Sequence, residues 1–172
     1  MSLFNSEFPK IEGLSYTKNY ISTEQEKFLI KQIDNQPWLN MMKRRVQHYG
    51  YYYKYKDRKL TPDLKIGELP NWLQILPNFD QVIINEYLTG QGITPHIDCI
   101  PCFGDTICSL SLLEPCEMIL ENGDVKYSII LEPRSLLIFQ GEARYKWKHS
   151  IPQRKSNIKN RRVSISFRKV AL

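Results

Sequence analysis

Two of the three histidines and one aspartate have the types and spacing of a mononuclear metal site. His96 and Asp98 form a His-x-Asp pair, and side chains two residues apart in extended backbone point to the same side. His149 follows later in the chain, where a neighbouring strand of a barrel can bring it alongside. Two imidazoles and a carboxylate on one face of iron(II) leave three open positions, which suit a chelating keto acid and dioxygen. Taken alone, the His-x-Asp pair also fits a surface histidine beside a turn aspartate.

The last alternating segment, Arg-Val-Ser-Ile-Ser-Phe-Arg, predicts where an acidic co-substrate binds. As a strand it places Arg162, Ser164 and Arg168 on one polar face and its apolar side chains on the other. Arginines on such a face are costly to bury unless anions meet them. A dicarboxylate such as 2-oxoglutarate supplies those anions through bidentate bonds. Asn85 and Tyr87 share a face in the same way and can hydrogen-bond carboxylate oxygens. An edge strand with a solvated polar face is the alternative.

Positive charge is concentrated in two segments of a chain whose net charge is +6. Residues 43–59 hold seven Lys/Arg and one acid, and residues 144–169 hold ten Lys/Arg and no acid. The remaining residues are therefore acidic overall. Basic segments of this kind displace counterions from phosphates, which favours a polyanionic partner. The alternative is that these residues only solvate strand edges and loops.

The first basic segment interleaves its cations with tyrosines, the composition of a stacking platform for nucleic-acid bases. We therefore expect residues 43–60 to form a substrate-recognition lid, with Arg45, Tyr49 and Tyr51 as contacts and Arg144 as a further contact near the metal. A base inside a duplex is out of reach of a metal-bound oxidant, so the target is single-stranded or flipped out. Alternation in a strand puts the odd-numbered tyrosines on one face, where packing on the core is the alternative role.

The N-terminal part of the chain predicts helices. Ser22 is a candidate N-cap with Gln25 three residues on, and Pro37 ends the apolar pattern, which predicts a helix over 22–36. A second short helix is expected over residues 68–76, with a proline in its first turn. Residues 1–43 are thus expected to be mainly helical support.

The rest of the chain reads as short strands. Asn122-Gly123 is a strong hairpin signal between two of them. Many short strands after N-terminal helices predict a mostly β protein of the α+β class, built as a double-stranded β-helix, the cupin-like jelly roll. A sandwich is the alternative. The expected strands are 82–87, 106–113, 118–120, 125–131, 135–139 and 162–168.

Composition fits a single domain over residues 1–172, with 42% hydrophobic and 24% charged residues. No run approaches the roughly 18 apolar residues of a membrane span, and residues 1–7 lack the basic and apolar regions of a secretory signal. We therefore expect a cytoplasmic monomer without membrane contact. In that compartment the four cysteines are expected to be reduced. Cys99-x-x-Cys102 lacks the second well-spaced pair that a structural zinc site needs.

Four motifs in order resemble the AlkB family of iron(II)- and 2-oxoglutarate-dependent dioxygenases over most of the chain. They are Asn85-x-Tyr87, Gly90-x-Gly92-Ile93-x-x-His96-x-Asp98, Gly141-Glu142-Ala143-Arg144 before His149, and Arg162-x5-Arg168. The resemblance implies a double-stranded β-helix that uses Fe(II), 2-oxoglutarate and O2. It also implies that Arg162, helped by Ser164, binds the far carboxylate of 2-oxoglutarate. The residues that it implies are His96, Asp98 and His149 for iron, and Asn85, Tyr87, Arg162, Ser164 and Arg168 for 2-oxoglutarate.

Within that family the chain is most similar to the branch that hydroxylates modified wobble uridines in transfer RNA. Base-repair members carry an acid two residues after the metal aspartate, where this chain has Ile100. The resemblance therefore implies an enzyme that demethylates or hydroxylates a modified base, in RNA in preference to DNA. The alternatives are a dioxygenase acting on a protein or lipid, and a non-catalytic RNA-binding module.

Overall fold

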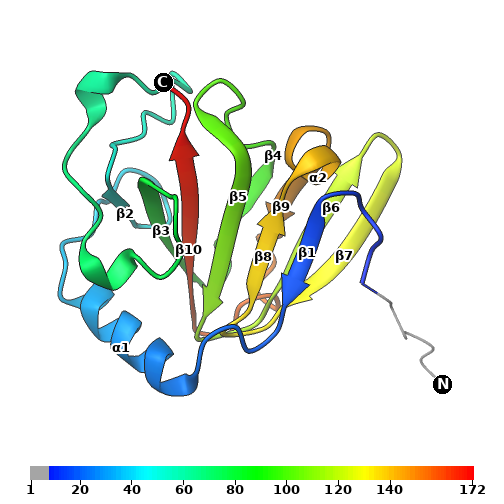
Figure 1. Cartoon of the computed structure of the whole chain (residues 1–172). Helices are drawn as coiled ribbons and strands as arrows, with labels where there is room; N and C mark the ends of the chain where they lie inside the picture. Colours follow the sequence, from blue (N-terminus) through cyan, green and yellow to red (C-terminus); the bar gives the residue numbers. More distant parts are fainter. Residues whose placement is uncertain (1–7) are drawn as a thin grey trace.

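Two antiparallel sheets face each other in the computed structural model, which describes residues 8–172 (Figure 1). The larger sheet has six strands in the order β1-β8-β5-β10-β3-β2, and the smaller has four in the order β4-β9-β6-β7. The strands of the larger sheet are β1 (Leu14–Thr17), β2 (Val46–Tyr49), β3 (Gln81–Leu88), β5 (Phe103–Leu112), β8 (Leu136–Phe139) and β10 (Arg161–Val170). Those of the smaller are β4 (Ile93–His96), β6 (Cys116–Asn122), β7 (Val125–Leu131) and β9 (Lys148–Ile151).

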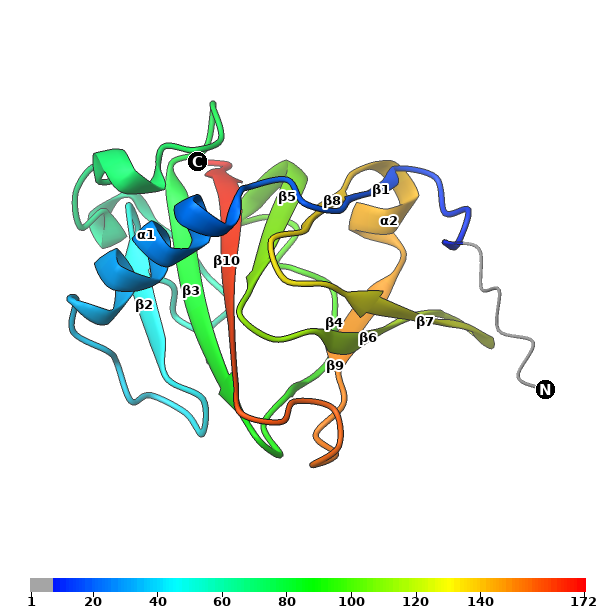
Figure 2. The same ribbon diagram turned by 90° about the horizontal axis from the view of Figure 1, so that it is seen from below.

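Alternation along the central strands divides the apolar residues between two cores. On β3, Val82 and Ile84 face outwards, where they pack with Leu29 and Ile33 of helix α1 (Thr23–Asp34). Ile83 faces the other way, into the space between the sheets. The larger sheet is therefore covered by α1 on one side and by the smaller sheet on the other, as Figures 1 and 2 show. Polar side chains on the inner face must then line a cavity or find partners.

The mostly β, double-stranded β-helix architecture predicted from the sequence is confirmed. Helix α1 begins after Ser22, whose Oγ accepts from the backbone N–H of Gln25. The backbone N–H of Ser22 donates in turn to Gln25 Oε1, which completes the predicted capping box. The Asn122-Gly123 signal corresponds to the turn between β6 and β7, where Asn122 pairs with Val125. No helix described by the structure is long and apolar enough to cross a membrane.

Three expectations about local structure were wrong. Residues 68–76 form only a 3-10 turn, η2 (Asn71–Leu73), because Pro70 and Pro77 bound the segment and leave room for only a short turn. Residues 8–43 are not mainly helical, since β1 pairs with β8 before α1 begins. The odd-numbered tyrosines do not share a strand face, because β2 ends at Tyr49 and Gly50 turns the chain with φ +76°. Residues 1–7, where a secretory signal was judged absent, lie outside the described residues.

Short elements that the sequence pattern did not reveal complete the fold. Helix α2 (Gly141–Tyr145) leads into β9, and the 3-10 turn η1 (Pro62–Leu64) follows the loop after β2. β4 and β9 have four residues each, too few to show a hydrophobic period. Both carry residues of the metal cluster described below.

A buried histidine makes the stability of this fold depend on pH. His48 on β2 accepts from the Tyr53 amide through Nδ1 at 3.3 Å, so its Nε2–H faces the Tyr55 hydroxyl at 3.0 Å. Burial, with a smaller effect of Arg168, lowers the pKa of His48 from 6.5 to about 4. The folded state therefore resists a proton that the unfolded chain takes up below pH 6.5, and stability is lost as pH falls from 6.5 towards 4.

We expect His48→Gln to remove up to about 3 kcal/mol of this acid destabilisation, because glutamine has a donor and an acceptor but no proton to take up. The measurement is urea unfolding of wild type and variant at several values between pH 7 and pH 4. Parallel stability curves for the two proteins would contradict the assignment.

Candidate metal centre and anion-binding cavity

Pairing of β4 with β9 brings the two candidate metal histidines together. The antiparallel register sets His96 directly opposite His149. At the start of β4 a side chain on Gly92 would collide with the backbone carbonyl of Ile151, so glycine is required for this close pairing. Asp98 follows two residues after the strand ends. The short strands thus place all three residues at one end of the smaller sheet.

The three side chains form a cluster with the shape of a metal site. One donor atom from each of His96, Asp98 and His149 lies within 4.8 Å of the others. The Asp98 Oδ1 atom is 3.4 Å from His96 Nε2 and 3.5 Å from His149 Nε2. His96 Nδ1 lies 2.8 Å from the Thr94 carbonyl oxygen, which accepts its proton and leaves the Nε2 lone pair facing the cluster. Two imidazoles and one carboxylate in this arrangement fit iron(II).

Electrostatics hold the ligands in the protonation states that a metal requires. Burial alone would raise the pKa of Asp98, but the Arg168 guanidinium keeps it well below its ordinary value. Burial, followed by the neighbouring His96, lowers the pKa of His149 to about 3. A carboxylate and a neutral imidazole are the forms that bind a cation.

A cavity of about 490 Å³ opens beside this cluster. It lies between the inner faces of the two sheets and contains the polar faces predicted for β3 and β10. Every residue proposed for iron or 2-oxoglutarate lines it: His96, Asp98, His149, Asn85, Tyr87, Arg162, Ser164 and Arg168. Their roles towards 2-oxoglutarate stay predictions.

Arg162 is the residue whose surroundings fit a carboxylate ligand. Its side chain is 1% exposed, and its Nη2 donates to the Ser111 hydroxyl at 2.8 Å. Its Nε–H is buried and has no partner among the described residues. The guanidinium lies 5.3 Å from the centre of the Tyr87 ring. A buried guanidinium without a counter-ion is costly, and the carboxylate of a keto acid would remove that cost.

Arg168 has the other position on the same strand face. Its Nε donates to Asp98 Oδ2 at 2.6 Å, so it holds the free oxygen of the metal carboxylate. The two arginines are therefore not equivalent in the structure. Arg168 is paired with the metal-ligand candidate Asp98, whereas Arg162 has no anionic partner among the described residues.

The residues predicted as substrate contacts lie away from the cavity or behind it. Arg45 makes two bonds to the buried Glu86 and covers the Trp38 ring. Tyr49 packs edge-on against Trp72 and Tyr51 packs on the core, and neither of them lines the cavity. These contacts support the fold, and contact of the three residues with substrate stays a prediction.

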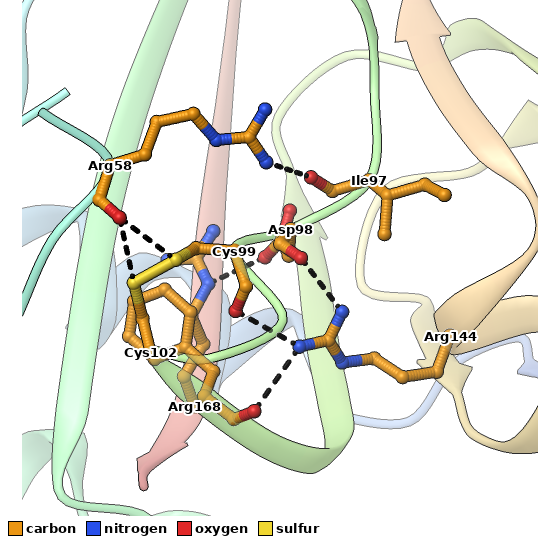
Figure 3. The surroundings of a disulfide bond; sticks show 8 residues. Arg58, Ile97, Asp98, Cys99, Cys102, Arg144 and Arg168 are labelled. Carbon is orange, nitrogen blue, oxygen red and sulfur yellow. Dashed lines mark hydrogen bonds and ion pairs between the residues drawn. A yellow bond between two sulfur atoms is a disulfide. The ribbon is translucent and has the colours of Figure 1, made fainter. Parts of the chain in front are cut away.

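Arg144 makes its hydrogen bonds within the protein. It is 2% exposed, and its guanidinium donates to the carbonyl oxygens of Asp98, Cys99, Phe103 and Gly104. Figure 3 shows it reaching the loop that follows the metal aspartate. It thus positions that loop, and its contact with substrate stays a prediction.

The same loop contains a disulfide between Cys99 and Cys102, so the expectation of four reduced cysteines was wrong for this pair. A tight turn brings their Cα atoms to 5.3 Å, within disulfide range. Both sulfurs lie against the Arg58 carbonyl oxygen, as Figure 3 shows. Cys108 and Cys116 are buried free thiols, as predicted.

Sequence reasoning missed several cavity residues in the segment that it treated as a lid. Lys43, Arg44, Tyr53, Tyr55 and Arg58 line the cavity. The basic and aromatic composition of residues 43–60 pointed to this segment. The pairing of Val46 with Asn85, which places Arg44 beside the candidate co-substrate residues, was not readable from that composition.

Known proteins are similar to the chain in sequence and in fold. The 2OG-Fe(II) oxygenase superfamily model matches residues 53–168. An Arabidopsis thaliana protein named alkylated DNA repair protein ALKBH8 homolog is 36% identical, and the match covers 99% of this chain and 61% of that protein. Uncharacterized protein L905 of Acanthamoeba polyphaga mimivirus is 34% identical over 93% of this chain and 86% of its own length.

Another relative is much longer than this chain. The Xenopus tropicalis tRNA (carboxymethyluridine(34)-5-O)-methyltransferase alkbh8 is 36% identical over 85% of this chain but only 26% of its own length. The solved structure of OsALKBH1 has a TM-score of 0.72 and 14% identity, covering 91% of this chain and 96% of that one. This structural likeness concerns the fold alone.

The different surroundings of two adjacent arginines give a direct test of the co-substrate site. We expect Arg162→Met to weaken 2-oxoglutarate binding by tens- to thousands-fold, because losing a desolvated charge pair costs about 2–5 kcal/mol. Calorimetric titration of metal-loaded protein measures this. Arg161→Met is the matched control, since Arg161 faces the other way and bonds Glu86 and Asp34. Equal losses in both variants would refute the assignment.

Removal of the Arg144 guanidinium should loosen the metal site without touching a ligand. We expect Arg144→Met to cost about 2–4 kcal/mol of stability and to weaken iron(II) binding, because buried carbonyls lose their donor. Lys146→Met on the same helix removes only an exposed ion pair with Glu142 and serves as control. Chemical unfolding and metal titration give the two readouts. Wild-type stability and wild-type iron(II) affinity in Arg144→Met would show that the metal site does not depend on the Arg144 guanidinium.

Proposed function

The chain belongs to the 2OG-Fe(II) oxygenase superfamily, and from this premise we propose that it oxidises an alkyl group on a modified base of nucleic acid, RNA in preference to DNA. One observation carries the proposal. The cluster of His96, Asp98 and His149 opens into the same cavity as Arg162, a buried cation with an unpaired donor. That combination is what a metal and a dicarboxylate together need.

Iron(II) and 2-oxoglutarate, when bound, couple activation of dioxygen and decarboxylation of the keto acid to succinate with hydroxylation of a substrate C–H bond. A hydroxylated N-methyl group leaves as formaldehyde, whereas a carbon-linked group keeps its hydroxyl. His96, Asp98 and His149 would hold the metal. Arg162, with Tyr87 and Asn85 beside it, would hold the co-substrate. Apolar side chains from both sheets exclude water from the reacting atoms: Ile83, Ile107, Met118, Phe139 and Ile151.

The nucleic-acid part of the proposal is supported by charge and by the relatives. Basic residues at the cavity favour a polyanion over an uncharged lipid or protein segment. A Caenorhabditis elegans relative, 26% identical, is named DNA N6-methyl adenine demethylase, whereas the 36% identical Xenopus relative is named for transfer RNA. A Macaca fascicularis relative, 39% identical, is also named for transfer RNA, whereas the 36% identical Arabidopsis relative is named for DNA repair. The preference for RNA rests on the relatives named for transfer RNA. A target held single-stranded or flipped out would reach the metal through the cavity mouth.

We also propose that the protein works as a monomer in the cytoplasm. Residues of one chain line the whole cavity, so a single copy can supply the site. Analytical ultracentrifugation tests the first statement and cell fractionation the second.

Turnover of the co-substrate tests the enzymatic proposal. Purified protein with iron(II), 2-oxoglutarate and modified transfer RNA should release succinate and one oxidised base in equal amounts. Alanine at His96, Asp98 or His149 should lower that release more than about 100-fold, since even groups that only support a metal ligand contribute 10–100-fold. His48→Gln, at the remaining histidine, is the control and should keep turnover. Equal turnover in all four variants would place the metal elsewhere. Succinate release that modified transfer RNA does not raise, with no oxidised base, would count against a nucleic-acid substrate and favour the protein or lipid alternative.

A further inference from the structure

The cavity has more positive charge than its metal and co-substrate can use. Its lining contains five cationic side chains and a single carboxylate, Asp98. Arg168 neutralises Asp98, and the two charges of an iron(II) ion balance the two carboxylates of 2-oxoglutarate. Arg162 and three further cations, Lys43, Arg44 and Arg58, then remain in excess. None of those three forms an ion pair with a carboxylate of residues 8–172. An anionic substrate is therefore needed to complete the charge balance.

Arg44 stands out among these cations by its position. It is half-buried, and its Nε donates to Asn85 Oδ1 at 3.0 Å. Its guanidinium lies 5.7 Å from the centre of the Tyr87 ring. Within residues 8–172 its two terminal nitrogens have no hydrogen-bond partner, so they are available to a ligand in the cavity. Its Nε is thus bound to Asn85, whereas its two Nη atoms can bind a ligand.

The neighbouring Arg45, unlike Arg44, has an acidic partner. Arg45 forms a two-point ion pair with the buried Glu86, which also accepts from Arg161. The two arginines lie just before β2 and point to opposite faces of the larger sheet, Arg45 towards Glu86 and Trp38 and Arg44 towards the cavity. Arg58 is exposed and uses Nη2 on the Ile97 carbonyl, which places a second cation at the rim beside the metal loop (Figure 3).

We propose that Arg44 binds a backbone phosphate of the substrate strand next to the target base, with Arg58 as a second phosphate contact at the rim. This inference rests on the proposed function and names the residues that hold its substrate. The guanidinium fork matches the geometry of phosphate oxygens. Because the same side chain bonds Asn85, the phosphate contact also fixes the strand relative to the co-substrate residues and hence to the metal.

The test is binding of a fluorescent single-stranded RNA of about twelve nucleotides, a length within the usual site size. The protein is loaded with iron(II) and 2-oxoglutarate without oxygen, and affinity is measured at several salt concentrations. We expect Arg44→Met and Arg44→Gln to weaken binding about 5- to 20-fold and to lower the salt slope by about 0.7, the value for one phosphate on a single strand. Arg44→Lys should keep the slope. Lys31→Met on α1, an exposed cation remote from the cavity, should change neither quantity.

The outcomes separate this inference from the function that it rests on. A wild-type protein without salt-dependent RNA affinity would overturn the nucleic-acid proposal itself. Wild-type affinity and slope in both neutral variants would overturn only the role of Arg44. Loss of 2-oxoglutarate affinity with unchanged RNA affinity would also overturn it, because Arg44 would then serve only to hold Asn85. A lower slope with unmodified RNA assigns the contact to phosphate, whereas a loss seen only with an acidic modified base would assign it to that base and overturn the phosphate contact.

Discussion

The ion pair between Asp98 and Arg168 links the metal cluster to the centre of the larger sheet. Asp98 is 7% exposed, and an isolated carboxylate at that depth would be protonated rather than charged. Arg168 keeps it ionised from β10, a strand paired on both sides, with β3 and β5. The position of Asp98, in the loop after β4, is thereby fixed by a central strand of the larger sheet. The facial arrangement of ligands depends on this contact as much as on the β4–β9 pairing.

Each arginine of the site has a role set by its partners rather than by its type. Arg144 binds only backbone carbonyls and shapes the loop after Asp98. Arg168 neutralises the ligand carboxylate, whereas Arg162 keeps an unsatisfied buried donor. Arg44 is held at one end by Asn85. Among the arginines that line the cavity, Arg44, Arg58 and Arg162 have no acidic partner in the described part of the chain, so their charge is available to ligands.

The sequence allowed prediction where a short-range rule decides the outcome. Alternation in β10 placed Arg162, Ser164 and Arg168 on one face, and the capping pattern located the start of α1. Prediction failed where the pairing of distant strands determines the role of a residue. Nothing local distinguishes Arg44 from Arg45, since only Glu86 and Asn85 on the neighbouring strand make one structural and the other open. The metal-site histidines illustrate both kinds of rule. Residue type and spacing suggested His96 and His149, but only the β4–β9 register brings them together.

Buried charge without a partner makes the protein incomplete until its ligands bind. The Arg162 donor costs free energy in the folded chain, and a carboxylate that satisfies it binds the folded state but not the unfolded one. The same reasoning applies to the metal, because the ligands are brought within 4.8 Å only in the fold. Metal and co-substrate therefore stabilise the fold by the free energy of their own binding. The structure gives up some stability to keep a charged, preorganised cavity, and the ligands that use the cavity restore it.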